Sequence, residues 1–599
     1  MYSYILDSIQ NYNPTVHLPS ANPISLQTTR TSTVPCPPQS MVSRENSSDS
    51  IVVRRSANYK PTIWHYDCIR SLTSEYVGDS FNMKIANLKG EVTTMLHKAL
   101  EPLKQLELID ILQRLGLSYH FEDDIRRILS SIYNTNRDYP DMCKKKSLYA
   151  TALEFRLLRQ NRYNVPQEIF KSFTNEKESF KECLCNDTEG MLALYEASFL
   201  LLEGENILEE ARDFATKHLK DYVKQSKDQN LCAMVNHALE LPLHWRMLRL
   251  ETNWFIDAYR SKKDANPIFL ELATLDFNVV QAVHQEELKE VSNWWRSTCI
   301  VEKMSFARDR LMANFLWTLG VSFQPEFGYN RKMLTKVNSM ITTIDDMYDI
   351  HGTLDELELF TNVVERWDVN AMEQLPYYMQ ICFLNLHNLV NEIVFHTLKE
   401  KELNIIRFLH KVWADLCRSY FLEAKWYYNG YTPSLQEYIE NAWISISGPV
   451  ILVHAYVFIT NPLTKEALDG LEEYPNMIRW SSTIVRLAGD LGTYVDELER
   501  GDVPKSIQCY MNDAGVSEKD ARQFISSLIS TIWKKINEER LSTTSPFSQI
   551  FTEITMNLSR MAQCIYQYGD GHGTEDRETM DQVLALLVHP ITLPKDQYA

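Results

Sequence analysis

The chain has 599 residues, 44% of them apolar, and a net charge of −18 at neutral pH. This length and composition can bury a large core, and the acidic balance argues against nucleic acid as a partner, because phosphate backbones require a basic surface. Only 18 glycines and 22 prolines argue against a β-rich or repetitive protein.

Residues 1–53 differ in composition from everything that follows. Up to Arg44 they contain one acidic residue, Asp7, and many Ser, Thr, Pro and Asn, with no amphipathic period and no apolar core region. This pattern is typical of a chloroplast transit peptide rather than a secretory signal, a disordered tail being the alternative. We therefore expect residues 1–53 to direct the protein to the plastid (chloroplast stroma).

From about Trp64 onward, helical hydrophobic periods dominate and predict an all-α fold. The clearest helical segments are residues 95–117, 151–159, 191–202 and 238–258. Residues 262–266 are polar and end at Pro267, which predicts a joint between a helical domain of residues 54–265 and a second one of residues 266–599.

Neither membrane insertion nor a structural zinc site is expected. The best apolar candidate for a membrane span, residues 450–459, is too short and carries His454. The eleven cysteines are scattered singly. Cys183 and Cys185 form the only close pair, and two residues cannot make a four-ligand zinc site, which indicates reduced thiols.

The first candidate site is the run Asp345-Asp346-Met347-Tyr348-Asp349, within residues 338–349, which contain no Gly or Pro. On a helix, Asp345 and Asp349 project from one face, about one turn apart. Two close carboxylates repel unless a cation lies between them, and Mg²⁺ prefers such oxygen ligands. The alternative is a solvated acidic face, but residues 341–344 are β-branched and favour the mouth of a buried pocket.

A second acidic cluster lies in residues 486–497. Asp490, Thr493 and Glu497 can share one helix face, and mixed oxygen ligands of this kind suit a second Mg²⁺ site. Guanidinium and ammonium groups would complement it by binding phosphate oxygens. The candidate basic residues are Arg308, Arg310, Arg486 and Lys505.

The chain resembles plant class I terpene synthases of the monoterpene-forming type. The first acidic run matches their DDxxD motif, Arg308–Arg310 their RxR motif, and Arg54-Arg55 followed eight residues later by Trp64 their RR(x)8W motif. Further matches extend through residues 500–510, so the resemblance covers essentially everything from Arg54 to the C-terminus.

The resemblance implies an N-terminal α-barrel-like helical domain without catalytic function and a C-terminal class I isoprenoid synthase helical bundle. It implies that an allylic diphosphate binds through three ions of Mg²⁺ or Mn²⁺. The implied metal ligands are Asp345, Asp346, Asp349, Asp490, Thr493 and Glu497. The residues implied to hold the substrate or the departing diphosphate are Arg308, Arg310, Arg486 and Lys505, with Asp345 and Asp349 acting through the metal.

The resemblance also implies surroundings for a carbocation. Trp317 is the candidate aromatic wall, with core packing as the alternative, and Gly448-Pro449 should kink a helix and expose carbonyl dipoles. Tyr566 and Asp570 match the family's C-terminal pair and could receive the terminal proton, as could the diphosphate. Arg54, Arg55 and Trp64 are expected to form a strap over the site.

Gly489 is where the chain departs from the family pattern. That position, four before Thr493 and eight before Glu497, carries Asn or Asp in the family, so one metal ligand is missing. Water could fill the place, Asp490 could turn inward, or the enzyme could be weak or inactive.

The expected activity is the metal-dependent ionisation of geranyl diphosphate to an acyclic or monocyclic monoterpene, such as ocimene, myrcene or linalool. The alternatives are a sesquiterpene synthase using farnesyl diphosphate, an isoprene synthase, or a silent diphosphate-binding homologue. We expect a monomer or a homodimer.

Overall fold

The structure is a computed structural model that describes residues 59–593 except 139–145, 178, 543, 544, 546, 574 and 575. Among these residues the regular structure is helical, and an isolated bridge between Thr174 and Phe180 is the one β pairing. The prediction of an all-α fold is confirmed. The proposed transit peptide, Arg54 and Arg55 lie outside the described residues.

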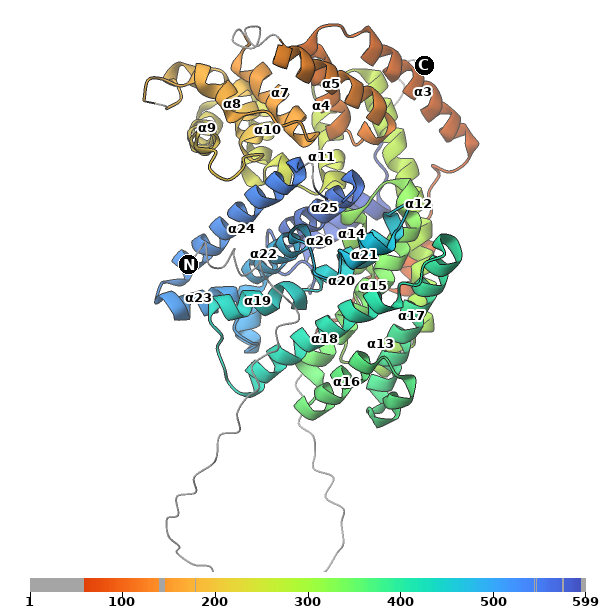
Figure 1. The fold of residues 1–599 in the computed structure, drawn as a ribbon. Helices are drawn as coiled ribbons and strands as arrows, with labels where there is room; N and C mark the ends of the chain where they lie inside the picture. The colour runs from red at the N-terminus through yellow and green to blue at the C-terminus, as the bar shows by residue number, and fades with distance from the viewer. Residues whose placement is uncertain are drawn as a thin grey trace, which may run out of the picture.

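The helices fall into two groups along the chain (Figure 1). The first group comprises α2 (Tyr66–Ser71), α3 (Asp79–Lys98), α4 (Pro102–Arg114), α5 (Glu122–Asp138), α7 (Leu148–Gln160), α8 (Thr188–Ser198), α9 (Asn206–Gln225), α10 (Gln229–Glu240) and α11 (Leu248–Arg260). The second comprises α12 (Pro267–Ser297), α13 (Ile300–Lys303), α14 (Leu311–Val321), α15 (Gly328–Asp346), α16 (Leu354–Arg366), α17 (Tyr377–Lys401), α18 (Ile406–Tyr428), α19 (Leu435–Ser445), α20 (Gly448–Ile459), α21 (Lys465–Asp469), α22 (Asn476–Arg500), α23 (Ser506–Ala514), α24 (Glu518–Leu541), α25 (Gln549–Ile565) and α26 (Arg577–Val583).

Short turns connect these helices. The 3₁₀ turns are η1 (Ser118–His120), η2 (Gln167–Phe173), η3 (Glu182–Asn186), η4 (Leu243–Trp245), η5 (Pro325–Phe327) and η7 (Val369–Gln374). Two π-helical turns are η6 (Met347–His351) and η8 (Leu584–Val588).

Prolines end two of the predicted helices earlier than expected. The predicted helix 95–117 is interrupted between α3 and α4, and the helix 238–258 between α10 and α11. Pro102 is the first residue of α4, and Pro242 lies in the break between α10 and α11. Proline disfavours helical geometry in the residue before it and lacks the N–H that a helix interior needs, so each proline interrupts the predicted helix. Segment 151–159 lies within α7, as predicted.

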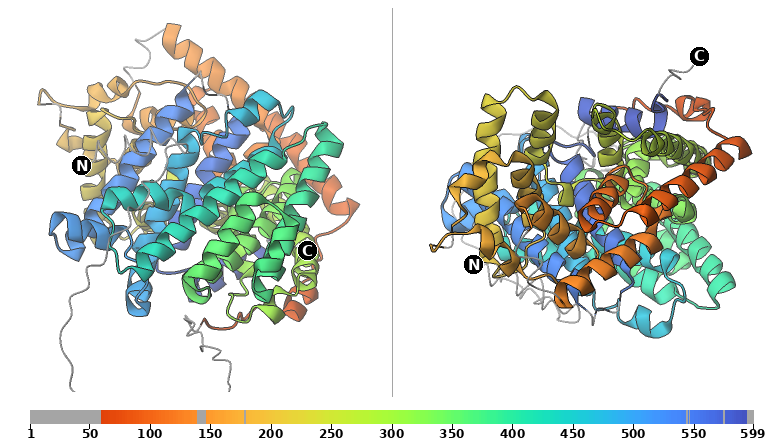
Figure 2. Two further views of the ribbon diagram at one scale, coloured as in Figure 1. Left: turned by 60° about the horizontal axis from the view of Figure 1, so that its bottom comes forward. Right: turned by 90° about the horizontal axis from the view of Figure 1, so that it is seen from above.

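The two groups pack against each other. The helices of the N-terminal group gather at one end of the molecule, and α12 runs from them along the C-terminal group (Figures 1 and 2). Asn537 of α24 donates hydrogen bonds to the carbonyls of Phe199 and Leu201, at 3.0 and 3.1 Å. Asn278 of α12 pairs with the backbone of Ile591, which ties the C-terminal segment to the same region. The proposed boundary at residue 265 directly precedes α12, whose N-cap is Asn266, and stays a prediction.

One apolar stretch is longer than the sequence suggested. Residues Leu435–Ile459 are long and apolar enough to cross a membrane by length and composition, since an 18-residue window within them has a mean hydropathy of 1.8. That window is nevertheless 83% buried inside the protein, and the stretch includes the break between α19 and α20. Helices buried in the core of a protein can be as long and as apolar as a membrane span.

Candidate active site

A cavity of about 150 Å³ lies among the helices of the C-terminal group. Its walls come mainly from α14, α15, α18, α20 and α22, and the turn after α25 closes one side. The predicted site residues that line it are Arg308, Trp317, Asp345, Asp349, Arg486, Thr493, Glu497, Lys505, Tyr566 and Asp570. The structure thus brings together residues that are more than 250 positions apart in the chain.

The first acidic run lies where α15 ends. The expectation of one continuous helix through Asp349 is wrong at its last turn, because α15 ends at Asp346 and the chain continues as the π turn Met347–His351. Asp345 and Asp349 nevertheless both line the cavity. Burial, and then the charge of Asp345, raise the pKa of Asp349 to about 7, so this wall favours a bound cation.

Asp346 has a different position from its neighbours. It is completely buried and does not line the cavity. Its carboxylate accepts a hydrogen bond from the backbone N–H of Arg308 at 2.6 Å and lies 2.8 Å from the Arg308 Nε. The Arg308 Nη2 in turn lies 2.8 Å from Asp345. Asp346, predicted as a metal ligand, therefore holds Arg308 in place beside Asp345.

The second acidic wall is the exposed end of one face of α22. Gly489, Thr493 and Glu497 line the cavity there, and the Thr493 hydroxyl donates to the Gly489 carbonyl at 2.9 Å. The Glu497 Oε2 is buried and has no hydrogen-bond partner among the residues that the structure describes. Burial, above all, raises the pKa of Glu497 to about 7, opposed by Lys505. A buried carboxylate oxygen without a partner fits a cation ligand.

Asp490 does not reach the cavity. Its carboxylate accepts hydrogen bonds from the Tyr438 hydroxyl at 2.9 Å and the Ser506 backbone N–H at 3.2 Å, and it lies 3.4 Å from Arg486. These contacts hold its carboxylate outside the cavity. The hypothesis that Asp490 turns inward to replace the ligand missing at Gly489 is therefore not supported by this arrangement.

Gly489 lies in the cavity wall beside the Tyr566 ring. A Cβ placed on it would lie 3.5 Å from the nearest atom, in the Tyr566 ring, which is ordinary van der Waals contact. Nothing in the packing at this position therefore requires glycine. The wall at this position therefore admits a Cβ without a close contact.

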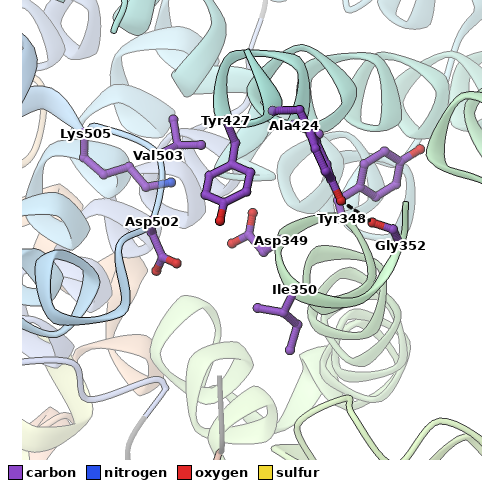
Figure 3. Close-up of a pocket in the computed structure, with 10 residues that line it drawn as sticks. Tyr348, Asp349, Ile350, Gly352, Ala424, Tyr427, Asp502, Val503 and Lys505 are labelled. Atoms are coloured by element: carbon purple, nitrogen blue, oxygen red, sulfur yellow. Dashed lines mark hydrogen bonds between the residues drawn. The ribbon is translucent and has the colours of Figure 1, made fainter. Parts of the chain in front are cut away.

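Cationic side chains stand beside both acidic walls. Arg308, Arg486 and Lys505 line the cavity and are buried or nearly so. Burial opposes the charge of Lys505, but Glu423 and Glu497 outweigh it and raise the Lys505 pKa above its ordinary value. A smaller pocket adjoins the cavity and shares Asp349 and Lys505 with it. In Figure 3, Lys505 and Asp502 lie across this pocket from Asp349.

The predicted Arg310 is buried away from the cavity wall. Its guanidinium donates to the carbonyl of Lys60 at 3.2 Å and to that of Gly573 at 2.9 Å. Tyr59 lines the cavity, with its ring 4.7 Å from the Arg308 guanidinium. The segment before α2 therefore reaches the cavity wall at Tyr59, and Trp64 packs, half-buried, against the core.

Aromatic rings form one part of the cavity lining. The Trp317 ring lies 6.1 Å from the ring of Tyr566 and, edge to face, 6.1 Å from that of His572. Burial, followed by the charges of Arg308 and Arg310, lowers the pKa of His572 to about 3, so its imidazole is neutral. Rings of this kind present electron-rich faces to a cation.

The predicted kink at Gly448-Pro449 is a complete break. Helix α19 ends at Ser445, Ser447 adopts a left-handed conformation with φ of 65°, and α20 begins at Gly448 with the proline in its first turn. Ser445, Ile446 and Ser447 line the cavity, so the break brings backbone polar groups to its wall.

Sequence reasoning missed several residues that line the cavity: Tyr59, Tyr420, Glu423, Arg500 and His572. Glu423 could have been identified from the sequence, because it lies between Phe421 and Ala424 on the buried face of α18. Acidic residues are rarely buried unless they are paired. Tyr59 and His572 lie in non-helical segments, where no periodicity indicates which side chains point inward.

The matches to known proteins agree with this geometry. Residues 296–535 match the model of the terpene synthase family, metal binding domain, and residues 63–239 match the terpene synthase N-terminal domain. The myrcene synthase, chloroplastic, of Quercus ilex is 62% identical over 99% of both chains. The (−)-alpha-terpineol synthase of Vitis vinifera is 61% identical over 91% of this chain and 92% of its own.

Two solved structures show the same fold. Limonene synthase with 2-fluorolinalyl diphosphate has a TM-score of 0.88 and 48% identity, covering 90% of this chain and 100% of its own. Isoprene synthase from grey poplar, in complex with three Mg²⁺ ions and dimethylallyl-S-thiolodiphosphate, has a TM-score of 0.82 and 46% identity, covering 89% and 99%. The chain belongs to the terpene synthase family. Its C-terminal group of helices is the divalent-metal-binding domain of that family.

Proposed function

We propose that this chain is a chloroplast monoterpene synthase that ionises geranyl diphosphate and releases a monoterpene and diphosphate. The observation that carries the proposal is one cavity lined by two acidic walls, three cationic side chains and several aromatic rings. Relatives at 50–62% identity that are named myrcene, terpineol, ocimene and limonene synthases support the substrate class, and several of them are named chloroplastic.

The metal would be Mg²⁺ or Mn²⁺, and three ions would bind, as in the isoprene synthase structure. Asp345 and Asp349 would hold one part of the cluster, and Thr493 and Glu497 the other, with water in place of the side chain missing at Gly489. The unpartnered Glu497 oxygen and the raised pKa of Asp349 support this donor set. When bound, the ions stabilise the negative charge that develops on the diphosphate oxygens.

Arg308, Arg486 and Lys505 would hold the departing diphosphate. Burial opposes their charge, but neighbouring carboxylates outweigh it and raise the pKa of all three, so they stay protonated. Fixed cations stabilise charge that appears only as the C–O bond breaks, which is the condition for lowering the barrier.

Trp317 would stabilise the carbocation in the cavity. Its ring is buried and lines the cavity beside Tyr566 and His572, so its electron-rich face could stabilise a cation there. The terminal proton would go to Tyr566 or Asp570 or to the diphosphate. Asp570 accepts the backbone N–H of Gly573 at 2.7 Å and lines the cavity.

The test is product analysis with protein lacking residues 1–53. Geranyl, farnesyl and dimethylallyl diphosphates are each incubated with Mg²⁺ or Mn²⁺, and volatiles are identified by gas chromatography. We expect a C10 product from geranyl diphosphate and its loss in Glu497→Gln. A product from farnesyl or dimethylallyl diphosphate alone would replace the substrate assignment, and no volatile from any of them would overturn the enzymatic one.

Gly489 favours a second candidate, a diphosphate-binding homologue with weak or no turnover. The cationic residues would still bind diphosphate, while the metal cluster lacks one protein ligand. Calorimetric binding of inorganic diphosphate with Mg²⁺, combined with no product under the conditions above, would support this candidate over the first.

A further inference from the structure

We propose that Glu182, Cys185 and His218 form a binding site for a soft divalent metal ion of the zinc class in the N-terminal group of helices. One ligand atom from each residue lies within 4.8 Å of the other two. None of the three residues lines the active-site cavity, and the proposal does not depend on the proposed function.

The local backbone explains why two of these side chains converge. Glu182 and Cys185 are three residues apart in the 3₁₀ turn η3. Because a 3₁₀ helix has three residues per turn, positions i and i+3 stand directly above each other. Cys183, one residue after Glu182, points elsewhere and is exposed. The turn therefore selects Cys185, and not Cys183, as the partner of Glu182.

The third ligand comes from a separate helix. His218 lies on α9, which is anchored by the buried side chains of Ala215 and Leu219. The ring of Phe214 lies 4.6 Å from the imidazole and limits its movement. The site would thus join η3 to α9, two elements that the chain connects only through α8.

The two distances from the Cys185 Sγ match tetrahedral coordination, and the third, between Glu182 and His218, is within 4.8 Å. The Cys185 Sγ lies 3.6 Å from the Glu182 Oε2 and 3.4 Å from the His218 Nε2. With bonds of about 2.3 Å to sulfur and about 2.1 Å to nitrogen or oxygen, tetrahedral angles require both separations to be about 3.6 Å. An ion could therefore bind all three atoms with small side-chain shifts, leaving the fourth position to water.

The ligand types select the metal. A thiolate and an imidazole favour zinc-class ions, whereas Mg²⁺ prefers oxygen ligands throughout. Cys185 and His218 are half-buried and Glu182 is exposed, so an ion can enter from solvent. Binding releases the thiol proton to water, and the ion takes its place between sulfur and nitrogen.

The test uses Co²⁺ as a spectroscopic probe on the full chain, stripped of metal and then supplied with saturating Mg²⁺ to occupy oxygen-ligand sites. We expect one Co²⁺ per chain with a thiolate-to-cobalt charge-transfer band, and displacement of that Co²⁺ by Zn²⁺. Cys185→Ser should lose the band, and the matched control Cys183→Ser should keep it.

His218→Gln provides a second measure that retains the thiol. Its Co²⁺ affinity should fall at least tenfold, while its melting temperature without metal equals that of the wild type. If no band appears, if Cys185→Ser keeps it, or if His218→Gln binds Co²⁺ as tightly as the wild type, the three residues form only a hydrogen-bonded cluster and the proposal is overturned.

Discussion

Restoring the missing ligand with Gly489→Asp tests how the second acidic wall works. The new carboxylate would stand one turn before Thr493 and two turns before Glu497, on the helix face that lines the cavity. Its Cβ would meet the Tyr566 ring at 3.5 Å, so the backbone need not move. Since Asp490 is held by Tyr438 and Ser506, it does not already supply this ligand.

The expected effect follows from replacing a water ligand by a charged oxygen. Changes in the groups that merely support metal ligands alter metal affinity about 10- to 100-fold. A direct ligand should therefore lower the half-saturating Mg²⁺ concentration at least tenfold, or about 1.4 kcal/mol. Without metal, a further carboxylate beside Glu497 adds repulsion, so the metal-free variant should melt at a lower temperature than the wild type.

The assay measures product formation from geranyl diphosphate against Mg²⁺ concentration, with thermal melting at each concentration. Gly489→Ala is the matched control, because it adds the Cβ without an oxygen and should leave the Mg²⁺ requirement unchanged. Gly489→Asn should fall between the two. A half-saturating concentration in Gly489→Asp within twofold of the wild type would refute the reasoning and show that the position does not contribute to metal binding.

Three further predictions concern the cavity wall and the stability of the fold. Trp317→Leu should lower kcat at least tenfold, since a desolvated cation–π contact contributes about 2 kcal/mol, and Trp317→Phe should recover most of the activity. Gly492→Ala should lower the free energy of unfolding by about 1–3 kcal/mol, because its Cβ would lie 2.9 Å from the carbonyl oxygens of Gly569 and Tyr566. Urea titrations measure this change, and an unchanged free energy of unfolding would contradict the close packing. Burial raises the pKa of Glu196 to about 7, so the stability it contributes is complete below its ordinary pKa and is lost as pH rises through about 7. Glu196→Gln should remove this pH-dependent loss of unfolding free energy, which amounts to up to about 3 kcal/mol. Unfolding titrations between about pH 5 and about pH 9 measure it, and an identical pH profile in variant and wild type would contradict the prediction.

The fold was predictable because the local signals agree with it. Helical periods, Pro267 after a polar joint and the scarcity of glycine all indicate helices, and the structure is all-α. The predicted helices are wrong where a single proline interrupts a continuous hydrophobic period, as Pro102 and Pro242 do. The π turn after Asp346 was not predictable from spacing, because an i, i+4 pattern reads the same in an α-helix and at the start of a π turn.

The site was predictable only in part. Spacing indicates which residues share a helix face, but it cannot tell which of two adjacent acids points into a cavity. Asp345 and Asp346 illustrate this, since one lines the cavity and the other is completely buried against Arg308. Glu423 reaches the cavity from α18, and a pairing with Lys505 across 3.8 Å depends on the tertiary packing of separate elements.

The two acidic motifs are organised in the same way, and this organisation indicates which interactions a glycine at position 489 affects. Asp346 is buried against Arg308, and Asp490 is buried against Arg486, so each motif contains a carboxylate that positions an arginine. Such a buried pair holds its arginine firmly, because removing either partner would leave an uncompensated charge. If position 489 is a ligand position, as the resemblance to the family implies, Gly489 takes a ligand from the cavity face, but Asp490 and Arg486 stay in place. Arg486 should therefore still be in place to bind diphosphate, and the cost of the substitution should fall first on metal affinity.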